Sequence, residues 1–219
     1  MTTTRQSAVI KVLLKDYGTT LAENLGVDAA DNKPQSLFCI LIAALLLSAR
    51  IGHTLALKSA IILLQRGWTS AAKMGNSTWQ QRVQALDEGG YARYDERTST
   101  MLGQTAQLLS EKYDGDPRRL REAAGADPAR ERKLLKEFKG IGDVGANIFF
   151  REVQLAWPEL YPFADERILD TAKELGLPRD VRKLAALVRR REDFVRLVNA
   201  LMRVRLERLQ DEVRTRAAQ

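Results

Sequence analysis

The sequence predicts an all-α fold. Apolar residues recur at helical spacing along most of the 219 residues, and no run of alternating β-branched residues predicts a strand. Leu37 to Ala49 is apolar on every side, which predicts a helix at the centre of a core. Further helices are predicted over residues 7–25 (interrupted at Gly18), 55–66, 70–74, 78–86, 95–112, 117–124, 128–138, 147–156, 168–175 and 180–216.

The charge balance favours an acidic partner. Lys and Arg number 35 against 28 Asp and Glu, which gives a net charge of +7. Nucleic acid is the first candidate for such a partner, although a basic chain with no specific anionic ligand fits the same balance. Aromatic residues make up only 6% of the chain, which disfavours an extended stacking platform for single strands.

The single cysteine and the single histidine restrict metal chemistry. Cys39 lies inside the apolar run, so it has no partner for an in-chain disulfide and is best explained as a small buried hydrophobe. One histidine, His53, cannot form a His-rich site, and we expect it at the surface or at a helix end. We therefore predict no bound metal.

No segment predicts membrane insertion or export. The longest apolar run, Leu37 to Leu47, is shorter than the roughly 20 residues that span a bilayer. The first residues show no pattern of a signal peptide. We expect a cytoplasmic monomer with no membrane partner, associated with the nucleoid when bound to DNA.

A glycine-rich reversal between two predicted helices is the most informative segment. Gly140 and Gly142 stand one residue apart, within LLKEFKGIGDVGANIFF from Leu134 to Phe150. Such glycines allow a tight turn, and the amides that follow Gly142 would point out of a helix N-terminus as an anion site. An ordinary helix–helix turn is the alternative interpretation.

This reversal resembles the hairpin of the helix-hairpin-helix DNA glycosylase superfamily, which includes endonuclease III. Phe138 to Gly142 follows the family pattern of apolar-x-Gly-apolar-Gly. Two more segments, in the same order, support the resemblance. Leu37 to Arg50 is similar to a family helix that ends in Leu-Leu-Ser-Ala, and Phe163 to Ile168 is similar to the segment that carries the catalytic aspartate.

The resemblance implies a fold of two helical lobes with a cleft between them. A helical barrel domain over residues 33–157 would carry the helix-hairpin-helix, and residues 1–32 plus 158–219 would form the second domain. Double-stranded DNA with a damaged or mismatched base would be the partner, with the base flipped into the cleft. The DNA contacts of the hairpin carry over to Lys139, Gly140, Ile141, Gly142, Val144 and Gly145.

Asp165 is the predicted catalytic residue. A carboxylate beside the sugar stabilises the positive charge that builds as a base leaves, and it orients a water molecule. Asp is also a favoured N-cap, so Asp165 would cap the following helix in either case. Glu166 and Asp170 are the fallback carboxylates, although both fit better as solvated helix residues.

Two features of endonuclease III are missing from this sequence. Its catalytic lysine, which forms a Schiff base and permits strand cleavage, corresponds to Val144 here. Its four-cysteine iron–sulfur cluster cannot form with Cys39 alone, so no cofactor is expected beyond a monovalent cation that the hairpin would allow. The tail from Arg189 instead predicts one long amphipathic helix. The lysine-free, cluster-free arrangement is similar to the thymine glycosylase branch that carries a methyl-CpG-binding domain.

Further residues are predicted to contact DNA, because they lie at or near positions that contact DNA in the family. Arg50 follows Leu-Leu-Ser-Ala, where endonuclease III has a glutamine that fills the gap left by the flipped base; a helix C-terminal arginine is the alternative. Tyr91, after two glycines, is the candidate for the wedge loop that separates the strands. Lys58, Arg93 and Lys139 are candidate phosphate contacts.

The sequence thus predicts a monofunctional DNA glycosylase that favours a pyrimidine base, such as uracil, thymine opposite guanine or a modified pyrimidine. Alkylated purines are the next substrate class. A non-catalytic reader of DNA damage or structure with the same fold is the second hypothesis. A glycosylase with lyase activity through another lysine, Lys139 or Lys136, is the third.

Overall fold

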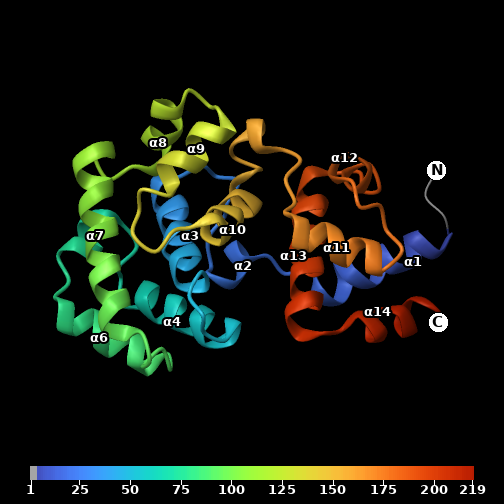
Figure 1. Cartoon of the computed structure of the whole chain (residues 1–219), viewed down its shortest axis with the longest axis horizontal. Helices are drawn as coiled ribbons and strands as arrows, with labels where there is room; N and C mark the ends of the chain where they lie inside the picture. The colour runs from blue at the N-terminus through green and yellow to red at the C-terminus, as the bar shows by residue number, and fades with distance from the viewer. Residues whose placement is uncertain (1–3) are drawn as a thin grey trace. The chain divides into compact units, whose positions relative to one another are not determined.

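The computed structural model describes residues 4–219, and this range contains helices and no strand (Figure 1). The predicted all-α class is therefore confirmed. The chain divides into two compact units. Unit 1 consists of the described part of Met1–Asn24 together with Phe150–Gln219, and unit 2 is Leu25–Phe149. Within the described range, no helix combines the length and the apolar character needed to cross a membrane.

These bounds differ from the expected 33–157 and 1–32 plus 158–219. Unit 2 begins earlier, at Leu25, and it ends inside one helix, α10 (Asp143–Val153). The last residues of α10 bond within unit 1. The Phe150 ring meets the Phe163 ring edge to face at a centroid distance of 5.6 Å. Glu152 accepts a hydrogen bond from the Ala22 amide at 3.1 Å. The end of α10 therefore belongs with the N- and C-terminal segments.

Unit 2 is a bundle of short helices around one buried helix. Its helices are α3 (Pro34–Leu47), α4 (His53–Gln65), α5 (Ala71–Gly75), α6 (Trp79–Glu88), α7 (Asp95–Tyr113), α8 (Pro117–Ala124), α9 (Pro128–Leu135) and the start of α10. Helix α3 packs against α4 and α8, and α7 packs against α5, α6 and α8. Helix α3 lies in the middle of these elements (Figure 1).

The predicted central helix is confirmed. Pro34 occupies the first turn of α3, and every residue from Ser36 to Leu46 is buried. Cys39 is among them, and burial raises the pKa of its thiol to about 11. The thiol is therefore protonated and unreactive at neutral pH.

Local capping explains why several predicted helix starts are correct. Thr78 and Gln81 form a reciprocal capping box at the start of α6. Helices α8 and α9 each begin with an N-cap aspartate, Asp116 and Asp127, followed by a proline that pre-sets the first helical dihedral. These side chains satisfy amides that the first helical turn leaves without an acceptor.

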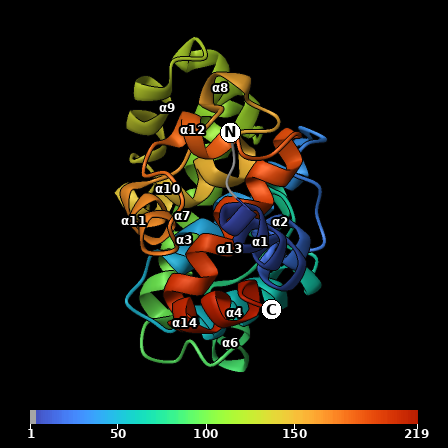
Figure 2. The same ribbon diagram turned by 90° about the vertical axis from the view of Figure 1, so that its right-hand side faces the viewer.

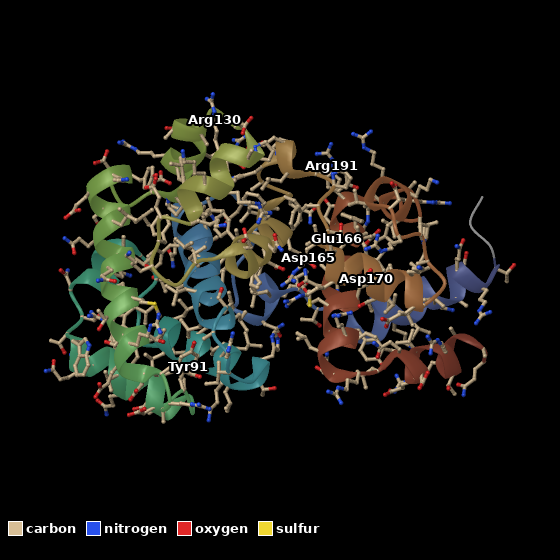
Figure 3. The ribbon with its side chains drawn as sticks, in the orientation of Figure 1. Tyr91, Arg130, Asp165, Glu166, Asp170 and Arg191 are labelled. Carbon is tan, nitrogen blue, oxygen red and sulfur yellow. The ribbon has the colours of Figure 1, made fainter. Side chains whose placement is uncertain are left out.

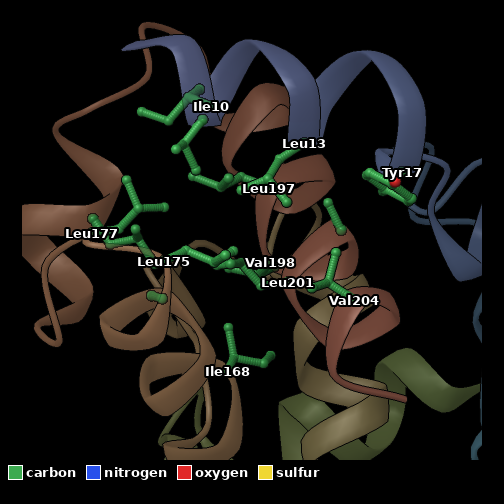
Figure 4. Packing of buried hydrophobic residues seen from close by; sticks show 14 of the residues in the cluster. Ile10, Leu13, Tyr17, Ile168, Leu175, Leu177, Leu197, Val198, Leu201 and Val204 are labelled. Atoms are coloured by element: carbon green, nitrogen blue, oxygen red, sulfur yellow. The ribbon is translucent and has the colours of Figure 1, made fainter. Parts of the chain in front are cut away.

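The helices of unit 1 pack around a shared apolar core. Its elements are α1 (Thr4–Val12), the π-helical turn η1 (Leu13–Tyr17), α2 (Leu21–Asn24), the end of α10, the 3₁₀ turn η2 (Pro158–Leu160), α11 (Glu166–Glu174), α12 (Val181–Ala185), α13 (Arg191–Glu207) and α14 (Gln210–Ala217). Leu197, Val198 and Leu201 of α13 are buried within the cluster in Figure 4, which also includes residues of η1 and α11. Helix α1 lies beside α14 (Figures 1 and 2).

The prediction of one long helix from Arg189 is wrong. The helix stops at Arg208, whose φ of +59° is left-handed, and a separate α14 follows. Leu209 packs on the unit 1 core. Tyr17 donates a hydrogen bond to Glu212 at 3.0 Å, and this bond joins α14 to η1. The chain turns because contacts on both sides of Arg208 outweigh the helical propensity of an arginine-rich segment.

A buried ion pair lies at the end of α10, and one of its members, Glu152, joins this helix to α2. Arg151 and Glu152 are almost fully buried, and Arg151 Nε lies 3.3 Å from Glu152 Oε1. The other carboxylate oxygen of Glu152 accepts the Ala22 amide, so both oxygens have partners. A pair of buried charges that is bonded in this way is sensitive to the removal of either member.

We predict that Glu152→Ala destabilises the protein by about 3–5 kcal/mol, because Arg151 is left as an uncompensated buried charge. Chemical denaturation measures the loss. The control is Glu207→Ala, which removes the exposed Arg203–Glu207 pair in α13 and should change stability by less than about 1 kcal/mol. Equal effects of the two substitutions would contradict the importance of the buried pair.

Candidate nucleic-acid interface

The chain between α9 and α10 makes the tight reversal that its glycines predict. The Ile141 amide donates to the Phe138 carbonyl at 3.0 Å. Gly140 adopts a φ of +93°, which side chains other than glycine rarely adopt. A Cβ at Gly140 would lie 2.9 Å from Met101 Sδ, in addition to the backbone strain. Conformation and space therefore both require glycine at this position.

The N-terminus of α10 presents unpaired donors. The Gly142 carbonyl accepts the Ala146 amide at 3.0 Å, so the helix begins immediately after Gly142, earlier than the predicted Asn147. The amides of Asp143, Val144 and Gly145 donate to no acceptor in the described part of the chain. These amides lie at the positive end of an 11-residue helix, where an anion is stabilised.

The first turn of α10 packs directly on the end of α3. A Cβ at Gly145 would lie 2.6 Å from Ser48 Oγ and 3.1 Å from the Ile141 side chain. Ile141 is buried, whereas Lys139 and Gly142 are exposed. The structure therefore brings the hairpin against Ser48, in the Leu-Leu-Ser-Ala segment at the end of α3. Ile141 supports the turn from inside and has little surface for direct contact.

A hollow of about 390 Å³ joins Arg50 to the hairpin. Arg50 and Gly140 both line it, and Arg97 adds a second exposed arginine. Half-buried Tyr94 also lines this hollow. Sequence reasoning missed Tyr94 and Arg97, because their position depends on how the loop after Gly90 packs. Arg50 and the hairpin residue Gly140 therefore face the same hollow, and the role of Arg50 in filling a gap in the duplex stays a prediction.

A charged pair beside the hairpin was also missed. Lys136 Nζ lies 2.9 Å from Asp143 Oδ1, and Arg132 lies 3.9 Å from the same oxygen. The hydrogen bond from Lys136 holds the pKa of Asp143 below its usual value, so this carboxylate is ionised at neutral pH. Its negative charge sits among the amides that would attract a phosphate. The signal in the sequence was an acidic residue directly after the hairpin glycines.

Tyr91 does not match its expected place on an exposed wedge loop. Its side chain has 0% exposure, and its hydroxyl donates to the Leu46 carbonyl at 2.8 Å. The large apolar ring gains more from burial in the unit 2 core than from exposure in a loop. Lys58 and Arg93 are exposed, and the Arg93 guanidinium lies over the Tyr94 ring at 5.5 Å.

Asp165, in unit 1, is the N-cap of α11. Its Oδ1 accepts the amides of Arg167 at 3.0 Å and of Ile168 at 3.3 Å. Within the described chain, Oδ2 receives no hydrogen bond, and the residue is half-buried. Figure 3 shows Asp165 at the start of α11. The capping interaction fixes one oxygen and leaves the other available to a ligand.

The fallback carboxylates are already paired. Arg179 donates to Asp170 at 2.7 Å and to Glu166 at 2.6 Å. The bond from Arg179 holds the pKa of Asp170 below its usual value. Glu166 and Asp170 lie on the same helix as Asp165 (Figure 3). The arginine neutralises both, so Asp165 is the better candidate for interaction with a substrate.

Gln154 holds the segment before Asp165. This fully buried side chain accepts the Phe163 amide at 2.9 Å and donates to the Phe163 carbonyl at 3.2 Å. The two bonds attach the backbone two residues before Asp165 to the end of α10. A lone glutamine in an apolar segment gives no sequence signal for such a role.

Comparison with protein-family models, curated proteins and solved structures returned no match to the chain. Within residues 4–219, no three His, Cys, Asp or Glu side chains gather as they would around a metal ion. The functional assignment therefore depends on the hairpin and on Asp165.

We predict that Gly145→Ala destabilises the protein by about 1–3 kcal/mol, because its Cβ would overlap Ser48 Oγ. The double variant Ser48→Ala/Gly145→Ala removes that oxygen and should recover most of the loss. Thermal unfolding of the two single variants and the double variant gives the coupling. Purely additive effects would contradict the close contact between α3 and α10.

Proposed function

We propose that this protein is a monofunctional DNA glycosylase with the two-lobed helix-hairpin-helix fold. The observation that carries the proposal is the hairpin packed on the end of α3, with the unpaired amides of the exposed residues Asp143 and Val144 at the start of α10; Gly145, also a predicted DNA contact, is buried. Backbone amides at a helix N-terminus are suited to a DNA phosphate, since they bind charge without reading sequence. The net charge of +7 favours the same partner.

In this proposal Asp165 drives the chemistry. As the bond between base and sugar breaks, positive charge grows on the sugar, and the Oδ2 of Asp165 stabilises it or orients the attacking water. The amides of Arg167 and Ile168 hold the other oxygen, which keeps the carboxylate in one orientation. The base leaves with the electron pair of the broken bond, water supplies the new hydroxyl on the sugar, and the remaining proton of that water passes through Asp165 or solvent to the departing base.

Val144 supports base release without strand cleavage. It is the second residue of α10 and is 40% exposed, at the position where the resemblance implies a lysine. A valine side chain forms no imine with the sugar. Lys136, one of the alternative amines, is bonded to Asp143. The expected product is therefore an intact strand with an abasic site.

The hollow beside the hairpin supports the role proposed for Arg50. Base flipping leaves a gap in the duplex and an unpaired partner base. Arg50 is exposed at the edge of the hollow, and its guanidinium can donate hydrogen bonds to such a base. Tyr91 is left out of this proposal because it is buried.

A non-catalytic reader of damaged DNA is the second candidate function. The ion pair between Lys136 and Asp143 bears on it, because the Asp143 carboxylate weakens phosphate binding at the hairpin, so that recognition depends more on other contacts. The two functions differ in turnover, because a reader binds damaged DNA and releases no base.

Asp165→Asn should lower the rate of base release at least about 10²-fold, with lesion-dependent binding retained. Single-turnover kinetics on a duplex that the wild type processes, together with binding by fluorescence anisotropy, measures both. The control is Asp170→Asn, which changes a paired carboxylate on the same helix and should keep most activity. Turnover that survives Asp165→Asn would overturn the catalytic assignment. Lesion-dependent binding by a wild type that releases no base would indicate the reader.

Asp143→Asn should tighten DNA binding about 2- to 5-fold, since it removes a negative charge from the phosphate-binding turn and releases Lys136. Anisotropy titrations at several salt concentrations provide the measurement. The matched control is Glu88→Gln, which removes an exposed carboxylate paired to Arg66 elsewhere in unit 2. The same gain in both variants would indicate a general charge effect and exclude a specific role for the hairpin.

A further inference from the structure

A buried arginine in unit 2 has no anionic partner. Arg82 of α6 is 7% exposed. Its Nε donates to the Ser99 carbonyl at 3.0 Å, and its Nη1 donates to the Ser77 carbonyl at 2.7 Å and the Ser77 hydroxyl at 3.0 Å. All of these acceptors are neutral.

Nη1 also donates to the Met74 carbonyl at 3.4 Å, so three backbone carbonyls and one hydroxyl hold the guanidinium, and it has no carboxylate partner within the described chain. No described Asp or Glu forms an ion pair with it, and no described atom accepts a hydrogen bond from Nη2. Burial lowers the pKa of the guanidinium, although arginine remains charged at neutral pH. A buried cation of this kind is costly unless an anion pairs with it.

Arg82 lines a hollow of about 510 Å³ between α5, α6 and α7. This size falls in the range of small-molecule sites. Gly103, in the middle of α7, lines the same hollow, and a Cβ there would lie 2.9 Å from Arg82 Nη2. A glycine inside a helix costs about 1 kcal/mol relative to alanine. Here the missing Cβ leaves room for Nη2 of Arg82 beside α7, at the wall of the hollow.

The walls of the hollow suit a flat polar ligand. Trp79 is 37% exposed, and its indole Nε1 donates to Thr100 Oγ1 at 3.1 Å, so the ring is held in place. The carboxamides of Asn76 and Gln104 lie at the exposed edge of the hollow. Carboxamides pair with the donor and acceptor edges of nucleobases, and an exposed indole stacks on a base.

We propose that this hollow is a nucleotide site, with the phosphate on Arg82 and the base against Trp79. It lies apart from the hairpin in sequence and goes beyond base excision. The phosphate and base could belong to a free mononucleotide or to a nucleotide at a single-stranded end of DNA, and the same chemistry would recognise both.

The test is a titration of the full chain with deoxyadenosine 5′-monophosphate, followed by the ¹H–¹⁵N indole signals of its three tryptophans. The Trp79 signal should shift and saturate. Gln104→Glu, which places a negative charge at the edge of the hollow, should weaken binding about 10-fold. Gln84→Glu is the matched control, because Gln84 is exposed on the same unit and does not line the hollow. It should leave the affinity unchanged.

Two further titrations test whether the phosphate is needed and whether the ligand is a free nucleotide or a DNA end. Deoxyadenosine, which lacks the phosphate, should bind at least about 10-fold more weakly. Equal binding of deoxyadenosine, equal binding by Gln104→Glu, or an unmoved Trp79 signal would overturn the proposal. Full affinity for deoxyadenosine 5′-monophosphate in a folded Arg82→Met variant would also overturn the proposal. A short single strand that shifts Trp79 at lower concentration than the mononucleotide identifies DNA as the source, and the reverse order identifies the free nucleotide.

Discussion

The close contact between the first turn of α10 and the end of α3 is the constraint on which the candidate interface depends. Gly140 and Gly145 have no Cβ, so Met101 and Ser48 approach the hairpin backbone directly. This approach fixes the direction of the α10 amides relative to unit 2, and it forms one wall of the hollow that contains Arg50. A side chain at Gly145 would separate α10 from the end of α3, and one at Gly140 would displace Met101 of α7. The α10 amides and the Lys136–Asp143 pair can bind an anion together only while this packing holds them in place.

The two candidate sites differ in whether their carboxylates are paired with a basic side chain. Asp143 places a negative charge in a turn that otherwise attracts anions, and Lys136 partly offsets it. In unit 1, Arg179 pairs with Glu166 and Asp170, whereas Asp165 keeps one oxygen without a donor in the described chain. Acidic side chains are therefore paired with a basic residue at Asp143 and at Glu166 and Asp170, whereas Asp165 has an oxygen that a ligand can contact. Arg82 shows the opposite situation, since it is a buried cation that no carboxylate of residues 4–219 contacts.

The sequence predicts most helices correctly where the signal is local. The apolar run of α3, the prolines and aspartates that start α8 and α9, and the hairpin glycines each act within a few residues of themselves. The break at Arg208 could not be predicted, because it results from packing of Leu209 and from the bond between Tyr17 and Glu212, which are distant in sequence. The bond of Tyr91 to Leu46 joins residues that are distant in sequence, so it could not be predicted either. The bonds of Gln154 to Phe163 are closer in sequence, but no pattern of residues indicates them. Of the candidate site, the hairpin geometry and the capping role of Asp165 were predicted, and the ion pair at Asp143 was not.

The central claim is that the protein releases a base from duplex DNA and leaves the strand intact. A single-turnover assay tests it most directly, on labelled duplexes that carry uracil, thymine opposite guanine, oxidised or hydroxymethylated pyrimidines, or alkylated purines. Each reaction is analysed with and without hot alkali, which cleaves an abasic site. The account predicts cleavage of at least one duplex only after alkali. Cleavage without alkali would contradict the interpretation of Val144, and no release from any duplex would contradict the glycosylase assignment itself.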